Sequence, residues 1–277
     1  MGVYGVVLGG WASNNKYSFY GAMRATAQMI SYEIPLGLCI LVVVATMGTL
    51  RLEEITSQQV DGYWLGFLPK WNVFLHPLAF VILFITALAE SNRTPFDLAE
   101  CEQELVGGYH TEYSALKFGL FFLAEYAHMI TASALMAVLF LGGWHLPWLP
   151  WTQASDVSWV GVLAKVGVLS AKIAAFLFVM MWIRWTLPRF RFDQLMRLAW
   201  KGLIPMTLAM FVLTIVLLWF GLHRTWWATA ADALVVAGAV LYMSTAKIAI
   251  TGRQRNMPPV SPPPGAIAGR LATEGAA

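Results

Sequence analysis

The chain has 277 residues, of which 58% are hydrophobic and only 12% are charged, and its formal net charge is +3. Soluble domains carry about 25% charged residues, so this composition excludes an ordinary soluble protein and indicates an integral membrane protein. Two cysteines, Cys39 and Cys101, are too few for a secreted disulfide scaffold or for a zinc site built on cysteines. The positive charges are few and scattered, so no nucleic acid is expected as a partner.

Six long apolar runs predict membrane-spanning helices, because about 20 apolar residues are needed to cross the hydrocarbon core. They cover residues 26–50, 72–89, 115–141, 159–185, 203–222 and 229–250. A shorter run, 3–11, follows no basic leader or cleavage site, so we interpret it as the end of a longer helix and not as a signal peptide. The expected fold is all-α: a polytopic transmembrane helix bundle over residues 1–250.

Lys and Arg gather in alternate loops, which predicts the orientation because cytoplasmic loops are enriched in basic residues. The more basic segments are 16–24, 90–117, 184–201 and 247–255, and the poorer ones are 51–71, 142–158 and 223–228. We therefore expect a multi-pass protein of the cell (plasma or inner) membrane, with the first set of segments in the cytoplasm. The proline-rich residues 251–277 show no apolar period and are expected to form a disordered tail.

The predicted cytoplasmic loop 90–114 is rich in carboxylates, although the anionic lipid headgroups expected on this side repel them. Thr94 and Pro95 are typical of an N-cap and a first helical residue, and Gly107–Gly108 is typical of a helix end. The loop is therefore expected to contain a short acidic helix that begins at Pro95.

Three carboxylates of this helix, Asp97, Glu100 and Glu104, are spaced to share one face, whereas Glu102 points away from them. A solvated acidic face is one interpretation of this spacing. The other is a loop packed against the membrane helices. Apolar neighbours such as Phe96 favour the second interpretation, because they make the segment too apolar to stay in water.

Several ionisable side chains lie in or beside the apolar runs. Glu125 is about ten residues into its run, roughly 15 Å along a helix, and such a costly position makes it a candidate for a proton relay; a hydrogen-bonded packing residue is the alternative. His128 shares its face one turn later, where a packing imidazole is the more common role. Glu33 and Glu90 lie at span ends, where relay and interface roles are equally open. Lys172 lies in mid-run and could pair with an acid.

The basic residues of the cytoplasmic segments have two interpretations. Arg184 and Arg189 fit plain membrane topology, since such loops are enriched in Arg and Lys. The functional interpretation is that they neutralise the acidic loop and dock hydrophilic partner proteins. Arg24 and Arg93 are expected to pair with Glu33 or with the loop carboxylates.

Three stretches of the chain resemble the H subunit of NADH:quinone oxidoreductase, the proton-pumping respiratory complex I. They are the acidic loop from Glu90 to Tyr113, residues 24–35 (RATAQMISYEIP) and residues 188–196 (PRFRFDQLM). The sequence Trp11-Ala-Ser-Asn also fits, and the likeness extends in order over about residues 4–220. Three such motifs in one order are not expected by chance.

The resemblance implies a membrane subunit of an H⁺-translocating enzyme complex. In that family the cytoplasmic loops form a quinone cavity together with hydrophilic partner subunits. Buried carboxylates then begin a proton path toward antiporter-like membrane subunits. Quinone would be the substrate, and this chain would bind no cofactor or metal, because two cysteines cannot hold an iron–sulfur cluster. FMN and the iron–sulfur clusters would lie in partner subunits.

The resemblance assigns no catalytic residue in the strict sense, but it implies two groups of site residues. The proton-relay candidates are Tyr32, Glu33, Glu90 and Glu125. The candidates for the quinone cavity and its coupling loop are Arg24, Arg93, Asp97, Glu100, Glu102, Glu104, Glu112, Arg184 and Arg189.

The sequence also departs from the family pattern. Family members begin with a first transmembrane helix, an amphipathic helix and a second transmembrane helix, which are absent before the first run. Cys101 stands where a glycine is usual, and the last run and the tail extend beyond the shorter members. A related subunit of a membrane-bound hydrogenase is an alternative, although the matches at 93–112 and 184–193 favour the quinone branch. A stand-alone proton-coupled carrier is a further alternative, but such carriers show paired repeats, and none is found here.

Overall fold

The computed structural model describes residues 2–60, 63–64, 68–97, 108–152, 158–222 and 224–255. The chain divides into two compact units, Met1–Val236 and Ala237–Ala277. The first unit contains every candidate site residue within the described ranges. Glu100, Glu102, Glu104 and Cys101 lie outside the described residues, as does the predicted tail from residue 256 onward.

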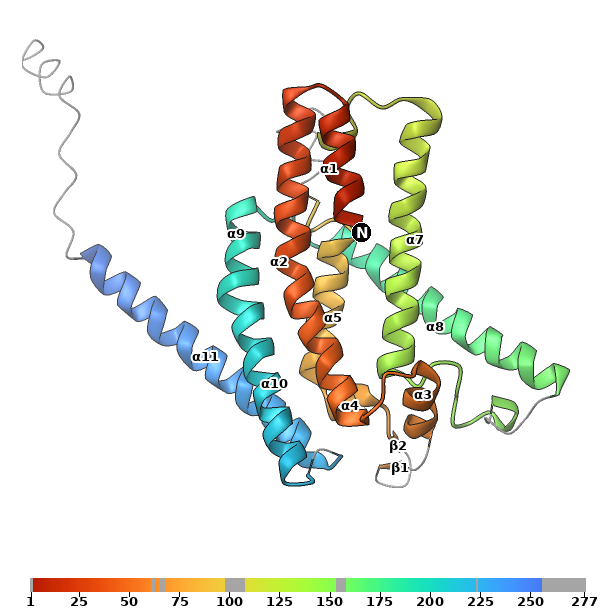
Figure 1. Ribbon diagram of the computed structural model, residues 1–277. Helices are drawn as coiled ribbons and strands as arrows, with labels where there is room; N and C mark the ends of the chain where they lie inside the picture. Colours follow the sequence, from red (N-terminus) through yellow and green to blue (C-terminus); the bar gives the residue numbers. More distant parts are fainter. Residues whose placement is uncertain are drawn as a thin grey trace, which may run out of the picture. The chain divides into compact units, whose positions relative to one another are not determined.

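The described residues are almost entirely helical (Figure 1), which confirms the predicted all-α fold. The longer helices are α1 (Gly2–Ala12), α2 (Lys16–Met47), α3 (Leu52–Val60), α5 (Pro77–Glu90), α7 (Ala115–Phe140), α8 (Trp159–Thr186), α9 (Phe192–Arg197), α10 (Ile204–Trp219) and α11 (Trp226–Arg255). The short elements are α4 (Asn72–Leu75), η1 (Gly108–His110), η2 (Pro150–Thr152) and a π-helical segment, Leu198–Leu203, that joins α9 to α10. Strands β1 (Tyr63–Trp64) and β2 (Leu68–Pro69) form a minimal antiparallel pair with Tyr63 opposite Pro69.

Among the described residues, four helical segments are long and apolar enough to cross a membrane. They are α2, α7, α8 and the continuous helix Phe192–Trp219, and they confirm four of the six predicted spans. The predicted span 72–89 is wrong as one helix, because the chain breaks at His76 between α4 and α5. Pro77 accounts for the break, since proline has no N–H to donate and is best accommodated in the first turn of a helix, where it begins α5. In the last predicted span, Trp226–Tyr242 forms a shorter apolar helix.

Helix α2 is the centre of the bundle and contacts α1, α5, α10 and η1. It begins ten residues before its predicted span, because the Asn15 side chain accepts the Tyr17 N–H at 3.0 Å and caps the start. It ends at Gly48, whose left-handed backbone (φ 71°) lets its N–H donate to the Val44 carbonyl. Capping and packing therefore make the polar first third of α2 helical, and a search for apolar runs does not detect this part of the helix.

The turn after α5 differs from the predicted acidic helix. Thr94 to Phe96 form a turn and a bend, so the chain is not helical at Pro95, where the predicted helix begins; the rest of that helix, residues 98–107, lies outside the described residues. Tertiary contacts hold the backbone instead: the Pro95 carbonyl accepts the Phe190 N–H at 3.1 Å, and the Phe96 carbonyl accepts the Gln28 amide at 2.8 Å. Donors from distant parts of the chain therefore position the backbone of this turn.

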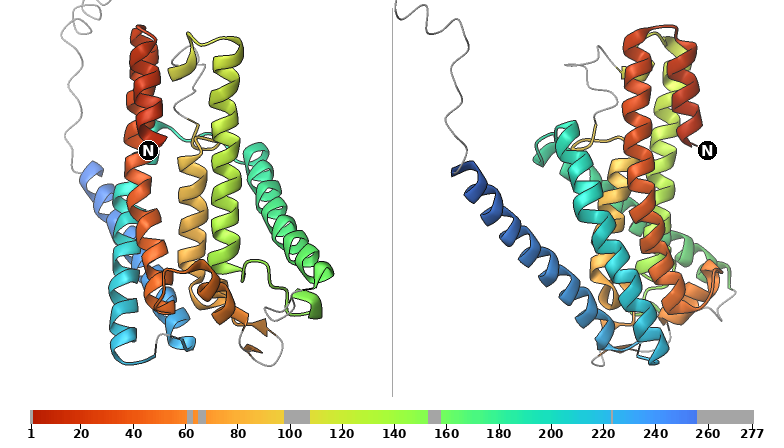
Figure 2. Two further views of the ribbon diagram at one scale, coloured as in Figure 1. Left: turned by 45° about the vertical axis from the view of Figure 1, so that its right-hand side comes forward. Right: turned by 60° about the vertical axis from the view of Figure 1, so that its left-hand side comes forward.

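Two ends of the bundle are distinguished by which segments meet there. Figures 1 and 2 show that α1 and the first halves of α2 and α7 extend past the C-terminal end of α5. The segment Gly108–His110 packs on α2 at this end, where Ser18 donates to the Tyr109 carbonyl at 2.6 Å. Gly21 is required for that approach, because a Cβ there would lie 2.9 Å from the backbone of Tyr109. We call this the loop end, and the end holding α3, β1, β2 and α4 the hairpin end.

Candidate functional site

A cavity of about 400 Å³ lies at the loop end, between α1, α2, the end of α5, η1 and the first half of α7. Glu33, Glu90, Glu125 and His128 line it together with apolar and aromatic side chains that include Tyr109 and Phe121. Three of the four proton-relay candidates therefore share one space, although they come from three different helices. A carboxylate cluster in a partly apolar cavity is where changes of charge have their largest effect.

Arg93 and Glu125 form an ion pair, with Nε and Oε1 2.5 Å apart and side chains 8% and 9% exposed. Arg93 reaches this position from the turn after α5, where Asn92 adopts a left-handed backbone (φ 49°) that asparagine tolerates better than most residues. The guanidinium also lies 4.6 Å from the centre of the Tyr126 ring. Arg93 therefore binds a mid-helix glutamate, whereas the sequence predicted Glu33 or the loop carboxylates as its partners.

Glu90 and His128 form a second, looser contact beside the first. Their charged atoms are 3.7 Å apart, and the side chains are 26% and 39% exposed. His128 is therefore more than a packing imidazole, because its ring faces a carboxylate across the cavity wall. Glu33, on the exposed side of α2, lines the same cavity. Solvent exposure therefore differs across this group: the Arg93–Glu125 pair is buried, whereas Glu90, His128 and Glu33 are more exposed.

Tyr32 does not line this cavity. Its hydroxyl donates to the Leu195 carbonyl at 3.0 Å, and its fully buried ring packs against Phe96. It thus lies on a different face of α2 from Glu33, in the core between α2 and α9. The Tyr32 ring thus packs against the turn after α5, and its hydroxyl lies away from the cavity that holds Glu33, Glu90 and Glu125.

The turn 91–97 is bound to the segment that connects α8 and α9. Arg189 donates to Asp97 at 2.6 Å, and Phe96 stacks on Phe190 with ring centres 5.5 Å apart and planes 14° apart. The structure thus brings together an acidic-loop residue and one of the arginines expected to neutralise the loop. An ion pair that is still partly reached by water contributes little stability alone, and the stacked rings add apolar contact to it.

The remaining candidates lie around the edge of this end. Glu112 accepts a hydrogen bond from the Asn15 amide at 2.6 Å, and the Arg24 guanidinium lies 5.9 Å from the centre of the Phe192 ring. Arg24 and Glu33 are nine residues apart on one helix, roughly 13 Å, which is too far for a direct ion pair; Glu100, Glu102 and Glu104, the other predicted partners in the loop, lie outside the described residues. Arg184 is exposed in the last turn of α8.

Comparison with known proteins bears directly on these residues. A family described as NADH dehydrogenase matches residues 1–215, which is more than half of the chain. The chain belongs to this family. The NADH-quinone oxidoreductase H subunit of Flavobacterium psychrophilum is 50% identical over 215 residues, covering 77% of this chain and 60% of that protein. The same subunit of Flavobacterium johnsoniae is 50% identical over 218 residues, covering 77% and 59%. One of Geobacter sulfurreducens is 49% identical over 215 residues, covering 77% and 56%.

The chain thus spans about 60% of the length of the curated relatives it matches. Membership of the NADH dehydrogenase family confirms the resemblance predicted from three motifs. Every candidate site residue lies within the matched segment 1–215, whereas α11 begins after it. Together with the four long apolar helices, the family identifies a multi-pass membrane protein.

The sequence left open that Lys172 pairs with an acid, but the structure shows it bound to backbone carbonyls. Its ammonium group donates to three carbonyls that follow the end of α7, those of Leu141, Gly143 and His145, at 2.7–2.8 Å. Three acceptors saturate the three N–H groups of an ammonium ion. Lys172 therefore caps the carbonyl end of α7, where a positive charge is stabilising, and no acid is needed. No local pattern signals this contact, because the acceptors are some 30 residues away in sequence.

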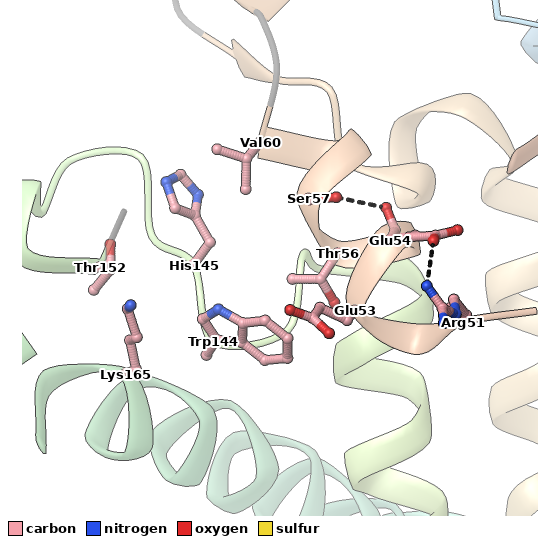
Figure 3. A pocket seen from close by; sticks show the side chains of 10 residues that line it. All are labelled: Arg51, Glu53, Glu54, Thr56, Ser57, Val60, Trp144, His145, Thr152 and Lys165. Carbon is pink, nitrogen blue, oxygen red and sulfur yellow. Dashed lines mark hydrogen bonds and ion pairs between the residues drawn. The ribbon is translucent and has the colours of Figure 1, made fainter. Parts of the chain in front are cut away.

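A second cavity, of about 490 Å³, lies at the hairpin end between α3, the loop after α7 and α8 (Figure 3). Glu54 is one of its lining residues, and hydrogen bonds from Thr49 and Arg51 lower the pKa of its carboxyl group. Burial and the Lys172 charge lower the pKa of His145, so its imidazole is neutral near pH 7. None of the family-implied candidates within the described ranges lines this cavity.

Proposed function

We propose that the chain is a membrane subunit of a proton-pumping NADH:quinone oxidoreductase, in which its loop end forms part of the quinone cavity. In this role it couples quinone reduction to proton translocation. The partners are hydrophilic subunits that carry FMN and iron–sulfur clusters and antiporter-like subunits in the same membrane. The complex lies in the plasma or inner membrane with the loop end in the cytoplasm.

One observation carries the proposal: Glu33, Glu90 and Glu125 meet His128 in one cavity at the loop end. An apolar wall of Val6, Met29 and Phe121 lies beside these acids. An apolar surface suits a lipid-soluble carrier, and the acids beside it are placed to respond to its charge. Residues 188–196, which carry one of the family motifs, are bound to the turn that presents Arg93.

The size of the electrostatic effect supports this coupling. A unit charge that appears about 4 Å from a carboxylate, at an effective dielectric constant near 20, contributes about 4 kcal/mol. That energy corresponds to roughly three pKa units, which is enough to change the protonation of a carboxylate. The accessible Glu90–His128 contact would receive such a change first, and the buried Arg93–Glu125 pair would transmit it along α7.

Substitution of Glu125 by Gln in the assembled complex tests the proposal. It removes the carboxylate that binds Arg93 while the side chain keeps its size. We expect proton pumping to fall by about tenfold or more, equivalent to about 1.4 kcal/mol or more. Proton uptake into membrane vesicles and quinone reductase activity are measured on the same preparation. Wild-type values of both in a fully assembled Glu125→Gln complex would remove Glu125 from the path.

Two further variants separate a loss of proton pumping from a failure of the chain to fold or assemble. Glu90→Gln leaves the Arg93–Glu125 pair intact and should reduce pumping in a normally assembled complex. Glu53→Gln removes an exposed acid of α3 at the hairpin end and should leave pumping unchanged. Equal effects of Glu90→Gln and Glu53→Gln would show that the loop-end cavity has no special role.

A further inference from the structure

Two cations from distant parts of the chain meet at a small cavity of the hairpin end. Three segments are predicted to lie outside the cytoplasm, namely 51–71, 142–158 and 223–228. Their sequences contain only three Arg or Lys residues: Arg51, Lys70 and Arg224. Lys70 and Arg224 both line a cavity of about 130 Å³. Arg51 lies elsewhere, where it forms an ion pair with Glu54 at 3.2 Å. Most of the positive charge on this side is therefore gathered in one place.

The cavity combines positive charge with apolar and amide side chains. Its other lining residues are Met47, Gln58, Trp71, Asn72 and Leu75. Within the described part of the chain no Asp or Glu lines it, so the two cations meet no carboxylate there. The volume is several times that of one water molecule, which is enough for a small anionic group. A cavity with this lining therefore favours an anion.

Arg224 is held in place and still has hydrogen atoms to donate to such a group. Its Nη2 donates to the Gln58 side-chain oxygen and lies 3.5 Å from Met47 Sδ. Both contacts position the guanidinium through one nitrogen. A guanidinium has five N–H groups in a planar fork, so Nε and Nη1 keep theirs for a further acceptor. Such a fork suits phosphate oxygens, which accept two parallel hydrogen bonds from it.

Asn72 contributes an unsatisfied acceptor to the same cavity. The residue is 1% exposed, and its side-chain nitrogen donates to the Leu139 carbonyl at 2.7 Å. A carbonyl only accepts, so the nitrogen of the amide must face Leu139 and Oδ1 is the atom that remains. Oδ1 is buried and accepts no hydrogen bond within the described structure. A ligand that carries an N–H or O–H group beside its negative charge would satisfy it.

Buried contacts hold together the segments that carry these residues. His76 lies in the break between α4 and α5, and its Nδ1 is 3.7 Å from Asp232 Oδ1 of α11. Asp232 Oδ2 accepts the Leu78 N–H at 3.3 Å, in the first turn of α5. The turn before α11, which carries Arg224, is therefore fixed beside α4, which begins at Asn72. The cavity is thus already formed before a ligand binds.

Aromatic side chains indicate that the cavity lies at the level of the lipid headgroups. Trp71 lines it and stacks on the exposed ring of Phe74, with ring centres 6.4 Å apart and planes 6° apart. Trp226 and Trp227 closely follow Arg224 in the chain and are also exposed and stacked. Tryptophans of membrane proteins gather where the hydrocarbon meets the headgroups. A lipid phosphate is therefore the anion most available to this cavity.

We propose that this cavity binds the headgroup of a membrane phospholipid. Lys70 and Arg224 donate hydrogen bonds to the phosphodiester, and a hydroxyl or ammonium group of the headgroup donates to Asn72 Oδ1. Basic pockets between membrane helices are a recurring kind of site for lipid headgroups. Glycerol and ethanolamine headgroups carry the donor that Asn72 requires, whereas choline carries none. The bound lipid joins Lys70, after β2, to the turn between α10 and α11, in a site separate from the loop-end cavity.

Native mass spectrometry of the delipidated full chain tests the proposal. Phosphatidylglycerol, phosphatidylethanolamine and phosphatidylcholine with the same acyl chains are added back one at a time. We expect the first two to bind about tenfold or more tightly than the third, because only they satisfy Asn72. Lys70→Gln and Arg224→Gln should each weaken the binding of the first two by about tenfold, since each removes a charge-assisted hydrogen bond. Arg51→Gln, at the third cation of these segments, should leave that binding unchanged.

The same measurements can overturn the proposal. Equal binding of the three lipids would mean that Asn72 meets no headgroup donor. Equal weakening by Arg51→Gln would show that charge alone, and not this cavity, attracts the lipid. Inorganic phosphate at the concentration of the lipid should not displace it, and displacement would assign the cavity to a free anion. Should Arg224→Gln fail to fold, the exposed Lys70 decides: Lys70→Gln should weaken binding and Lys70→Arg should retain it. Equal binding by those two variants would contradict the proposal.

Discussion

Arg93 and Lys172 are both cations removed from bulk water, and the protein stabilises them in opposite ways. Arg93 at the loop end binds the Glu125 carboxylate, which is itself titratable. Lys172 near the hairpin end binds three backbone carbonyls, which carry permanent dipoles and cannot take up a proton. The Glu125 carboxylate can take up a proton, whereas a protonated Lys172 and the carbonyls around it cannot. Burial of a cation therefore does not by itself mark a candidate for proton transfer, because the chemistry of its partner differs between the two cases.

The largest expected effect comes from removing one member of the loop-end pair. Arg93→Gln leaves the Glu125 carboxylate without its guanidinium, and breaking a buried ion pair costs about 3–5 kcal/mol. Adding Glu125→Gln should recover part of that loss, because the buried charge disappears with its partner. Unfolding of the full chain in detergent gives the four free energies of this double-mutant cycle. Strictly additive losses would mean that the two side chains do not stabilise each other.

A smaller effect is expected at the hairpin end. Lys172→Met leaves the three carbonyls after α7 without their donor, which should cost about 1–3 kcal/mol of unfolding free energy. Because carbonyls take no part in proton transfer, the ratio of protons pumped to quinone reduced should stay at the wild-type value in the assembled complex. Lys117→Met, at an exposed position in the first turn of α7, is the control for loss of a lysine. A changed ratio in Lys172→Met would place Lys172 in the proton path and remove its contrast with Arg93.

The smallest effect is a pH dependence at His145, whose carbonyl is one of the Lys172 acceptors. Burial and the Lys172 charge lower the pKa of His145. The unfolded chain therefore binds a proton that the folded chain resists, so stability should fall as the pH drops below about 6.5. In His145→Gln, Tm should fall less than in wild type as the pH drops below that value, and the difference should be a few degrees at most. Lys172→Met should reduce the steepness in part, because burial remains. A steeper curve in either variant would show the opposite sign.

Local patterns in the sequence predicted much of the fold and part of the site. Composition indicated a membrane protein, and apolar runs located four of the long helices. The spacing of Glu125 and His128 predicted one shared helix face, and both side chains line the loop-end cavity. The prediction failed where a single residue reversed a local trend. Pro77 divides a run of apolar residues into two helices, and the carbonyls around Pro95 are occupied by donors from α2 and from the segment before α9.

The sequence alone was sufficient for the class of protein, the family and the residue types available for chemistry, because hydropathy, caps and motifs act over a few neighbouring residues. The partner that each charged group meets followed from the tertiary structure and from nothing local. Arg93 and Glu125 are 32 residues apart, and His76 and Asp232 are 156 residues apart. Such pairs are set by the packing of several helices around α2, and the free energy of a buried charge depends on the groups within a few ångströms of it. That neighbourhood exists only once the bundle has formed.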